Sequence, residues 1–144
     1  NVRELLGKRM LFFDGGMGSM LQKTVWVRVK FPNFKPYNAA LIEKIHTEYL
    51  EAGANIITTN TFGANPLKSE EIGKAFDMII AAAIGIARKA VNSFQSEGNP
   101  RFVAFDIGPC GKLLEPLGDL SFDDCYDAFA KIAKTAEKCV PTLL

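Results

Sequence analysis

The sequence predicts an α/β fold in which parallel strands alternate with helices that cover them. Three short segments, 10–13, 56–62 and 102–107, are rich in apolar or β-branched residues and have the composition of buried strands. Three longer segments carry apolar residues at helical spacing, and they follow the strand segments in alternation. This order predicts right-handed βαβ crossovers, either in an open doubly wound sheet or in part of a (β/α)8 barrel.

Composition narrows the class of protein further. The 144 residues have the length of one ordinary domain, and 48% hydrophobic with 23% charged residues is typical of soluble globular proteins. A formal charge of +1 gives no reason to expect nucleic acid or an anionic membrane as partner. The three cysteines show no CxxC spacing, no secretory leader pattern is visible, and the most apolar window, 78–87, is too short to span a bilayer. We therefore expect a cytoplasmic protein with reduced thiols.

The first predicted strand, Met10 to Phe13, runs into a loop that is rich in glycine and carries one carboxylate. A carboxylate can accept an ammonium group, while glycines let backbone N–H groups approach an anion closely. The loop lacks the Lys-Ser/Thr ending of a P-loop and the third glycine of the dinucleotide fingerprint. It therefore predicts a site for a small zwitterion, and a plain glycine turn after a strand is the alternative. The candidate binding residues are Asp14, Gly15, Gly16, Met17, Gly18 and Ser19.

Segment 23–37 interrupts the alternation. It holds Lys23, Arg28, Lys30 and Lys35 without any acidic residue, and valines alternate around Trp26. We interpret it as a hairpin or an extended excursion, and in a near-neutral chain a solvated loop is favoured over a nucleic-acid contact.

The predicted helices have recognisable ends. Asn38 can cap a helix that ends at Gly53, and Ser69 opens a second one that reaches Phe94. Ser121 with Asp124 forms a capping box for a third helix, with an apolar stripe along Phe122, Cys125, Phe129, Ile132 and Ala136. A complete barrel needs roughly 250 residues, so the chain would supply three units, with 140–144 as the possible start of a fourth strand.

Polar residues also gather at the ends of the second and third predicted strands. Thr59, Asn60 and Thr61 close the second strand, and Asp106 opens the loop after the third. Ligands of parallel α/β folds lie at the carboxyl ends of the strands, so Asn60, Thr61 and Asp106 are further candidate binding residues. A polar network at the strand end is the alternative for the Thr-Asn run, and capping of its own loop is the alternative for Asp106.

The remaining reactive side chains give little support for catalysis. His46 is the only histidine, and its place in the middle of a helix favours a packing role over a catalytic one. Cys110 follows a predicted strand end, but a single cysteine is weak support for a nucleophile or a zinc site. Cys125 and Cys139 fit packing roles. We therefore predict no catalytic residue and no metal ligand within this chain.

Three ordered motifs, at 13–22, 45–65 and 106–113, go beyond these local patterns. Together they resemble the homocysteine S-methyltransferase domain at the N-terminus of cobalamin-dependent methionine synthases. The resemblance covers nearly the whole chain apart from residues 23–40. It implies that residues 1–144 are one partial homocysteine-binding domain, the N-terminal half of a (β/α)8 TIM barrel with three to four βα units, ending at the start of strand four.

The resemblance also implies a reaction and a ligand. In this family a methyl group from methylcobalamin or 5-methyltetrahydrofolate is transferred to the zinc-bound thiolate of homocysteine, which gives methionine. Asp14 would lie near the ammonium group of L-homocysteine, and the backbone amides of residues 15–19 near its carboxylate.

The zinc ligands of the family are three cysteines in the second half of the barrel, and Cys110, Cys125 and Cys139 do not stand in their places. The resemblance therefore assigns zinc, methylcobalamin and the methyltransferase activity to a longer parent protein. The expected partners are L-homocysteine, the missing half-barrel, and the cobalamin and folate domains of that parent protein. This chain alone would be an inactive fragment, and a non-catalytic half-barrel that associates with itself through open sheet edges is the alternative.

Overall fold

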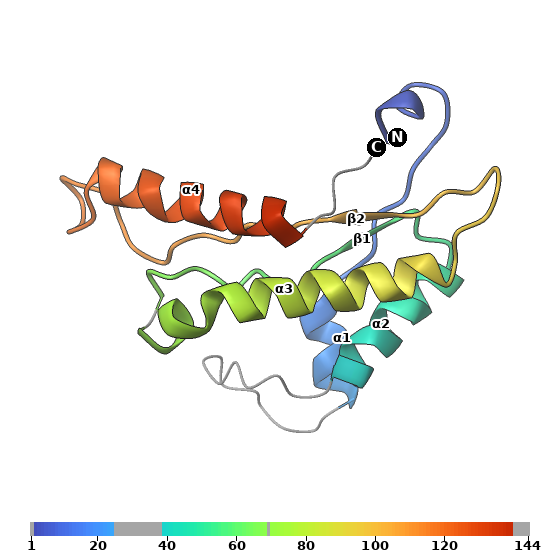
Figure 1. The fold of residues 1–144 in the computed structure, drawn as a ribbon, viewed down its shortest axis with the longest axis horizontal. Coiled ribbons are helices and arrows are strands. Elements are labelled where there is room, and N and C mark those ends of the chain that lie inside the picture. Colours follow the sequence, from blue (N-terminus) through green and yellow to red (C-terminus); the bar gives the residue numbers. More distant parts are fainter. Residues whose placement is uncertain (1, 25–38, 69, 140–144) are drawn as a thin grey trace. The chain divides into compact units, whose positions relative to one another are not determined.

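The computed structural model describes residues 2–24, 39–68 and 70–139 (Figure 1). It confirms the α/β class. The elements in chain order are the 3-10 helix η1 (Val2–Glu4), α1 (Met17–Thr24), α2 (Ala39–Glu51), β1 (Ile56–Thr58), α3 (Glu70–Asn92), β2 (Phe102–Ala104) and α4 (Phe122–Cys139). None of the helices in the described ranges has the length and apolar character needed to cross a membrane.

The chain divides into two compact units, which are described separately. Unit 1 comprises Asn1–Thr59 and Ile86–Ala104, and unit 2 comprises Asn60–Gly85 and Phe105–Leu144. Helix α3 contributes its first part to unit 2 and its last part to unit 1. The excursion expected at 23–37 and the caps expected at Asn38 and Ser69 lie wholly or largely outside the described residues.

The sheet of unit 1 is built around β1. Strands β1 and β2 are parallel, with Ile56 opposite Phe102 and Thr58 opposite Ala104. Phe13 forms an isolated parallel bridge to Ile56, and the N–H of Asp14 donates to the carbonyl oxygen of Ile56 at 2.9 Å. Because Ile56 is paired with both neighbours, β1 lies between segment 12–14 and β2, in the order that βαβ connections predict.

The strands are shorter than the sequence predicted. Segment 56–62 forms a strand only over Ile56–Thr58, because a turn begins at Thr61, whose carbonyl oxygen accepts from the N–H of Ala64 at 2.8 Å. The prediction that 10–13 is a buried strand is wrong. It contributes a single bridge residue, and Met10, Phe12 and Phe13 are 75%, 56% and 61% exposed, since no described element covers them.

The core of unit 1 forms where α2, β1 and the last part of α3 meet. Its buried members are Leu50, Ala54, Ile57, Ala87, Ala90 and Val91. Helix α2 ends as predicted, because Gly53 adopts a φ of 104°, a backbone conformation that residues with a Cβ rarely adopt. Of the apolar positions predicted for this helix, Ile42 and Ile45 are buried, while Leu41 and Tyr49 are half-buried.

Unit 2 packs α4 against the first part of α3. Its buried cluster contains Ala64, Phe76, Ile80, Ile84, Ile132 and Ala136. Ser121 caps α4 as predicted, because its hydroxyl accepts from the N–H of Asp124 at 3.1 Å. The reciprocal bond of a capping box differs, since the Asp124 carboxylate accepts from the Ser121 hydroxyl at 2.6 Å. The predicted stripe fails at its first member, because Phe122 is 71% exposed at the start of the helix and takes no part in the cluster.

Candidate functional site

The Asp14 carboxylate is held in place at the end of β1. Its Oδ2 accepts from the backbone N–H of Thr58 at 2.9 Å, and its Oδ1 accepts from the Thr58 hydroxyl at 2.8 Å. Each carboxylate oxygen has more than one acceptor position, so these two bonds fix its orientation without using all of its capacity. The result is an oriented, partly exposed negative charge beside the glycine loop.

The side chain of Tyr49, on α2, contacts this loop. Its hydroxyl donates to the carbonyl oxygen of Gly16 at 3.4 Å, and a Cβ added at Gly15 would lie 2.8 Å from the same hydroxyl oxygen. A larger residue at position 15 would therefore displace the loop or the Tyr49 ring. Sequence reasoning assigned the glycines to the site but missed Tyr49, because its position at helical spacing indicated only core packing.

The second half of the predicted loop is helical. Residues Met17, Gly18 and Ser19 form the first turn of α1, and the N–H of Met20 donates to the carbonyl oxygen of Gly16 at 3.3 Å. The prediction of an irregular loop through Ser19 is thus wrong in its second half. The capacity of these backbone N–H groups to bind an anion is retained. The first N–H groups of a helix have no acceptor within it and carry partial positive charge that favours an anion.

His46 lies on the same helix as Tyr49 and is completely buried, at 0% exposure. Burial lowers the pKa of its imidazole, and the Asp14 carboxylate acts in the opposite direction. Within the described part of the chain neither ring nitrogen has a hydrogen-bond partner. His46 is therefore a neutral core residue, which agrees with its expected packing role. Its pKa depends in part on the charge of Asp14.

Unit 2 contains the other three candidate residues. The Thr61 hydroxyl donates to the backbone carbonyl oxygen of Asp106 at 2.6 Å, so these two predicted residues are brought together. Thr61 is 1% exposed, while Asn60 and Asp106 are half-buried. The hydrogen bond joins the two strand ends, which is what the alternative of a polar network at the strand end predicted.

The same two segments approach each other closely at Gly108. A Cβ at this position would lie 2.0 Å from the carbonyl oxygen of Phe62, so only glycine fits there. Lys68 contacts the same residue, since its Nζ donates to the Phe62 carbonyl oxygen at 3.0 Å and lies 4.9 Å from the ring centroid. The loop after β2 is thereby fixed against the loop after β1 through backbone contact.

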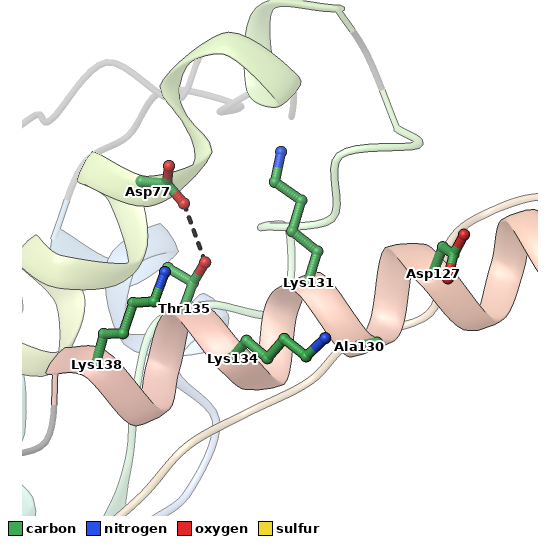
Figure 2. Close-up of a pocket in the computed structure, with 7 residues that line it drawn as sticks. All are labelled: Asp77, Asp127, Ala130, Lys131, Lys134, Thr135 and Lys138. Carbon is green, nitrogen blue, oxygen red and sulfur yellow. Dashed lines mark hydrogen bonds between the residues drawn. The ribbon is translucent and has the colours of Figure 1, made fainter.

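A surface depression of about 360 Å³ lies between α3 and α4 in unit 2 (Figure 2). Figure 2 shows the Thr135 side chain directed at Asp77, and the hydroxyl donates to the carboxylate at 3.0 Å. Lys131 extends from α4 over the Phe76 ring, at 5.3 Å from its centroid. None of the predicted site residues lines this depression, and we assign its contacts to the packing of the two helices.

No group of three or more His, Cys, Asp or Glu side chains within 2–24, 39–68 and 70–139 could hold a metal ion. All three cysteines are free: Cys110 is buried, and Cys125 and Cys139 are half-buried. The zinc implied by the family resemblance therefore does not fit a set of residues in this part of the chain.

Comparison with known proteins decides the family. The sequence model of the family described as homocysteine S-methyltransferase matches residues 11–143. The chain belongs to the homocysteine S-methyltransferase family.

This chain is similar to two curated methionine synthases, from Mycobacterium tuberculosis (strain ATCC 25618 / H37Rv) and Mycobacterium leprae (strain TN). It is 30% identical to each over an alignment 142 residues long, which covers 92% of this chain and 12% of the relative. The chain thus spans about an eighth of the length of these relatives.

Two solved structures of the homocysteine methyltransferase MmuM from Escherichia coli have a similar fold. The metallated form has a TM-score of 0.74 at 20% identity, and the oxidized form has a TM-score of 0.75 at 21% identity. In both comparisons the match covers 99% of this chain and 55% of the other.

Proposed function

We propose that this chain carries the amino-acid-binding part of a methionine-synthase-type homocysteine S-methyltransferase. The observation that carries the proposal is the Asp14 carboxylate, which Thr58 orients beside the amide-rich start of α1. Membership of the family and 30% identity to methionine synthases support it. In the parent protein, the methyl group carried by methylcobalamin and supplied by 5-methyltetrahydrofolate would pass to the sulfur of homocysteine.

The loop suits the amino-acid end of L-homocysteine, which is a zwitterion at neutral pH. Asp14 would accept hydrogen bonds from the ammonium group through the lone pairs that Thr58 leaves available. The backbone N–H groups from Gly15 to Ser19 would receive the carboxylate, helped by the partial positive charge at the start of α1. The proposal keeps Asn60, Thr61 and Asp106 as further candidate homocysteine-binding residues, because they follow the carboxyl ends of the second and third predicted strands.

We assign homocysteine binding and zinc binding to different halves of the parent barrel on the basis of the residues present. The described residues do not fit a zinc site, so we place the zinc ligands in the C-terminal half of the barrel. Residues 1–144 would then be the N-terminal half of a TIM barrel. This half alone would bind homocysteine without catalysing methyl transfer. The free cysteines fit a cytoplasmic location.

Titration calorimetry of the purified chain with L-homocysteine, with and without zinc, tests the proposal. We expect weak binding that does not depend on zinc. The Asp14→Asn variant should bind at least tenfold more weakly, because a hydrogen bond to a charged group contributes about 1.5–3 kcal/mol. The analogue 4-sulfanylbutanoate, which lacks the ammonium group, should lose affinity for the wild-type chain by a similar factor.

The matched control is Asp127→Asn, which removes an exposed carboxylate in unit 2 and should leave binding unchanged. A folded wild-type chain that does not bind homocysteine would contradict the assignment of the loop. Tight binding that requires zinc would instead place metal ligands within this chain, and would contradict our assignment of the zinc ligands to the C-terminal half of the barrel.

A further inference from the structure

Helix α4 of unit 2 carries exposed charges in a fixed order. Its first half presents Asp123 and Asp127 to solvent, and its second half presents Lys134 and Lys138. These four residues and Ala130 follow one another at intervals of three or four positions, the spacing at which side chains are neighbours on one side of a helix. They therefore form a single row, with a small residue at its centre, which we refer to as the charge stripe.

Most of the charge stripe borders the depression between α3 and α4. Figure 2 shows Asp127, Ala130, Lys134 and Lys138 following one another along α4, and all four line the depression. The contacts between the two helices at this place are made by other side chains. Within the described part of the chain, none of the charged residues of the stripe forms an ion pair. Their charges are therefore available to a partner.

The helix itself does not account for this order of charges. Asp123 and Asp127 are like charges four positions apart, and so are Lys134 and Lys138, an arrangement that destabilises an isolated helix. The helix macrodipole favours an acid in the first turn and a base in the last turn, where Asp123 and Lys138 lie. Its effect falls off beyond these turns, so it does not explain Asp127 and Lys134. A partner with the opposite order of charges would explain all four.

A second copy of α4 has that opposite order when it runs antiparallel to the first. The two aspartates are four positions apart, and the two lysines have the same separation, about 6 Å along the axis. With a twofold axis beside Ala130, Asp123 of each copy lies opposite Lys138 of the other, and Asp127 lies opposite Lys134. Each ion pair then occurs twice by symmetry. The small side chain of Ala130 lets the two helices approach closely at the axis.

Apolar side chains beside the charge stripe add to this pairing. Tyr126 is 64% exposed and lies three positions after Asp123 and four before Ala130, so it adjoins both. Phe122, one turn earlier, is 71% exposed. Exposed ion pairs contribute little by themselves, and burial of these rings supplies an apolar contribution. One pair of helices buries less than the roughly 1,200 Å² of a standard interface, so the expected dimer is weak.

We propose that unit 2 mediates dimerisation of this chain through antiparallel pairing of α4 along the charge stripe. The pairing does not involve the glycine loop of unit 1, and it goes beyond the proposed function without depending on it. It also differs from association through open sheet edges, because ion pairs between exposed residues weaken as salt is added.

Charge reversal within the stripe tests the proposal by sedimentation velocity at high protein concentration and low salt. Asp127→Lys places two cations opposite each other, and Lys134→Glu places two anions opposite each other. Each should raise the dissociation constant of the dimer about tenfold or more. The double variant Asp127→Lys/Lys134→Glu exchanges the two charges and has the net charge of the wild-type chain. It should recover the wild-type dissociation constant.

The matched controls are Glu51→Lys and Lys112→Glu, which make the same changes of net charge at exposed positions outside the stripe. They should dimerise as the wild-type chain does. An equal mixture of the two single stripe variants should also recover the dimer, which would show that both are folded. For the wild-type chain, about 1 M NaCl should weaken the dimer about tenfold relative to about 0.05 M.

Four outcomes would overturn the proposal. The first is a wild-type chain that stays monomeric at high concentration and low salt, and the second is association that salt does not weaken. The third is a failure of both the double variant and the mixture to recover the dimer. The fourth is dissociation of the controls to the same extent as the single stripe variants, because net charge alone would then explain the effect.

Discussion

At the scale of single residues, His46 is unusual because a polar ring is buried in unit 1 without a hydrogen-bond partner among the described residues. A buried polar group without a partner costs about 1–3 kcal/mol, and that cost grows if the group must also carry a charge. The lowered pKa of His46 reflects this cost. The native chain therefore favours the neutral imidazole.

This preference makes stability depend on pH. The pKa of His46 in the folded chain lies below the value of 6.5 that applies when the chain unfolds, so the unfolded chain binds more protons as the pH falls. The contribution to the free energy of unfolding is complete above this value and is lost as the pH falls through the folded pKa. Urea denaturation at about pH 7.5 and about pH 5.5, on either side of the ordinary histidine pKa, measures it.

The His46→Leu variant isolates this contribution. An apolar side chain of similar size leaves no buried polar nitrogen, so it should match or exceed wild-type stability at the higher pH. Its free energy of unfolding should fall less on acidification than that of the wild-type chain. The carboxylates titrate in both proteins, so an equal fall in both would show that His46 does not carry the effect.

At the scale of elements, the glycine loop depends on its contact with α2. A Cβ at Gly15 would meet the Tyr49 hydroxyl at 2.8 Å and two ring carbons at 3.1 and 3.2 Å, so Gly15→Ala must move the loop or the ring. Overpacking of this kind costs about 1–3 kcal/mol. We expect that loss in the free energy of unfolding from urea titration, together with weaker homocysteine binding.

Gly18→Ala provides the matched control. No heavy atom lies within 4 Å of a Cβ at Gly18, and alanine favours the helix by up to about 1 kcal/mol relative to glycine. The control should therefore be neutral or stabilising. Adding Tyr49→Phe to Gly15→Ala should recover part of the loss, because it removes the nearest atom but leaves the ring. Equal effects of the two glycine substitutions would argue against the contact.

The elements differ in how far the sequence could predict them. Helices α2 and α4 were predictable because Gly53 ends the first and Ser121 caps the second. Helix α1 was not, since glycines at its start disfavour a helix and indicated a loop instead. The predicted second strand ran too far, because Thr61 and Phe62 have the composition of a strand while the turn that ends it depends on backbone hydrogen bonds.

The candidate site was also only partly predictable from the sequence. Its residue types were predictable, since a carboxylate in a glycine loop is visible in the sequence. The two bonds from Thr58 that orient Asp14 were not, because they join residues separated by 44 positions. No local pattern in the chain contains that pairing, and it became visible only with the register of β1.

At the scale of the whole molecule, the chain exposes many large apolar side chains. Met10 and Phe13 flank the sheet of unit 1 at 75% and 61% exposure, and Leu117 of unit 2 is 83% exposed. Among the described residues, segment 12–14 pairs with β1 alone. Exposed apolar surface beside an open sheet edge favours association, which is the observation in support of the alternative assembly function.

We therefore expect the isolated chain to self-associate as its concentration rises, and sedimentation velocity over a dilution series measures this. Replacing both Phe12 and Phe13 with Ser should shift the equilibrium toward monomer, since burying one Phe contributes about 1.5–3 kcal/mol. Met78→Ser, which changes an exposed side chain on α3, is the control and should have a smaller effect. A wild-type chain that stays monomeric at high concentration would contradict this expectation.

Unit 1 is built from two segments that are separated in the sequence, and this separation has a consequence for biosynthesis. The loop at Asp14 is supported by β1, and β1 in turn pairs with β2, which ends at Ala104. On the ribosome, where about 5–20 residues are added each second, the N-terminal segment must wait for most of the chain before unit 1 is complete. During that interval β1 lacks its partner strand, so Ile56 and Ile57, which are buried in the complete unit, are available to chaperones.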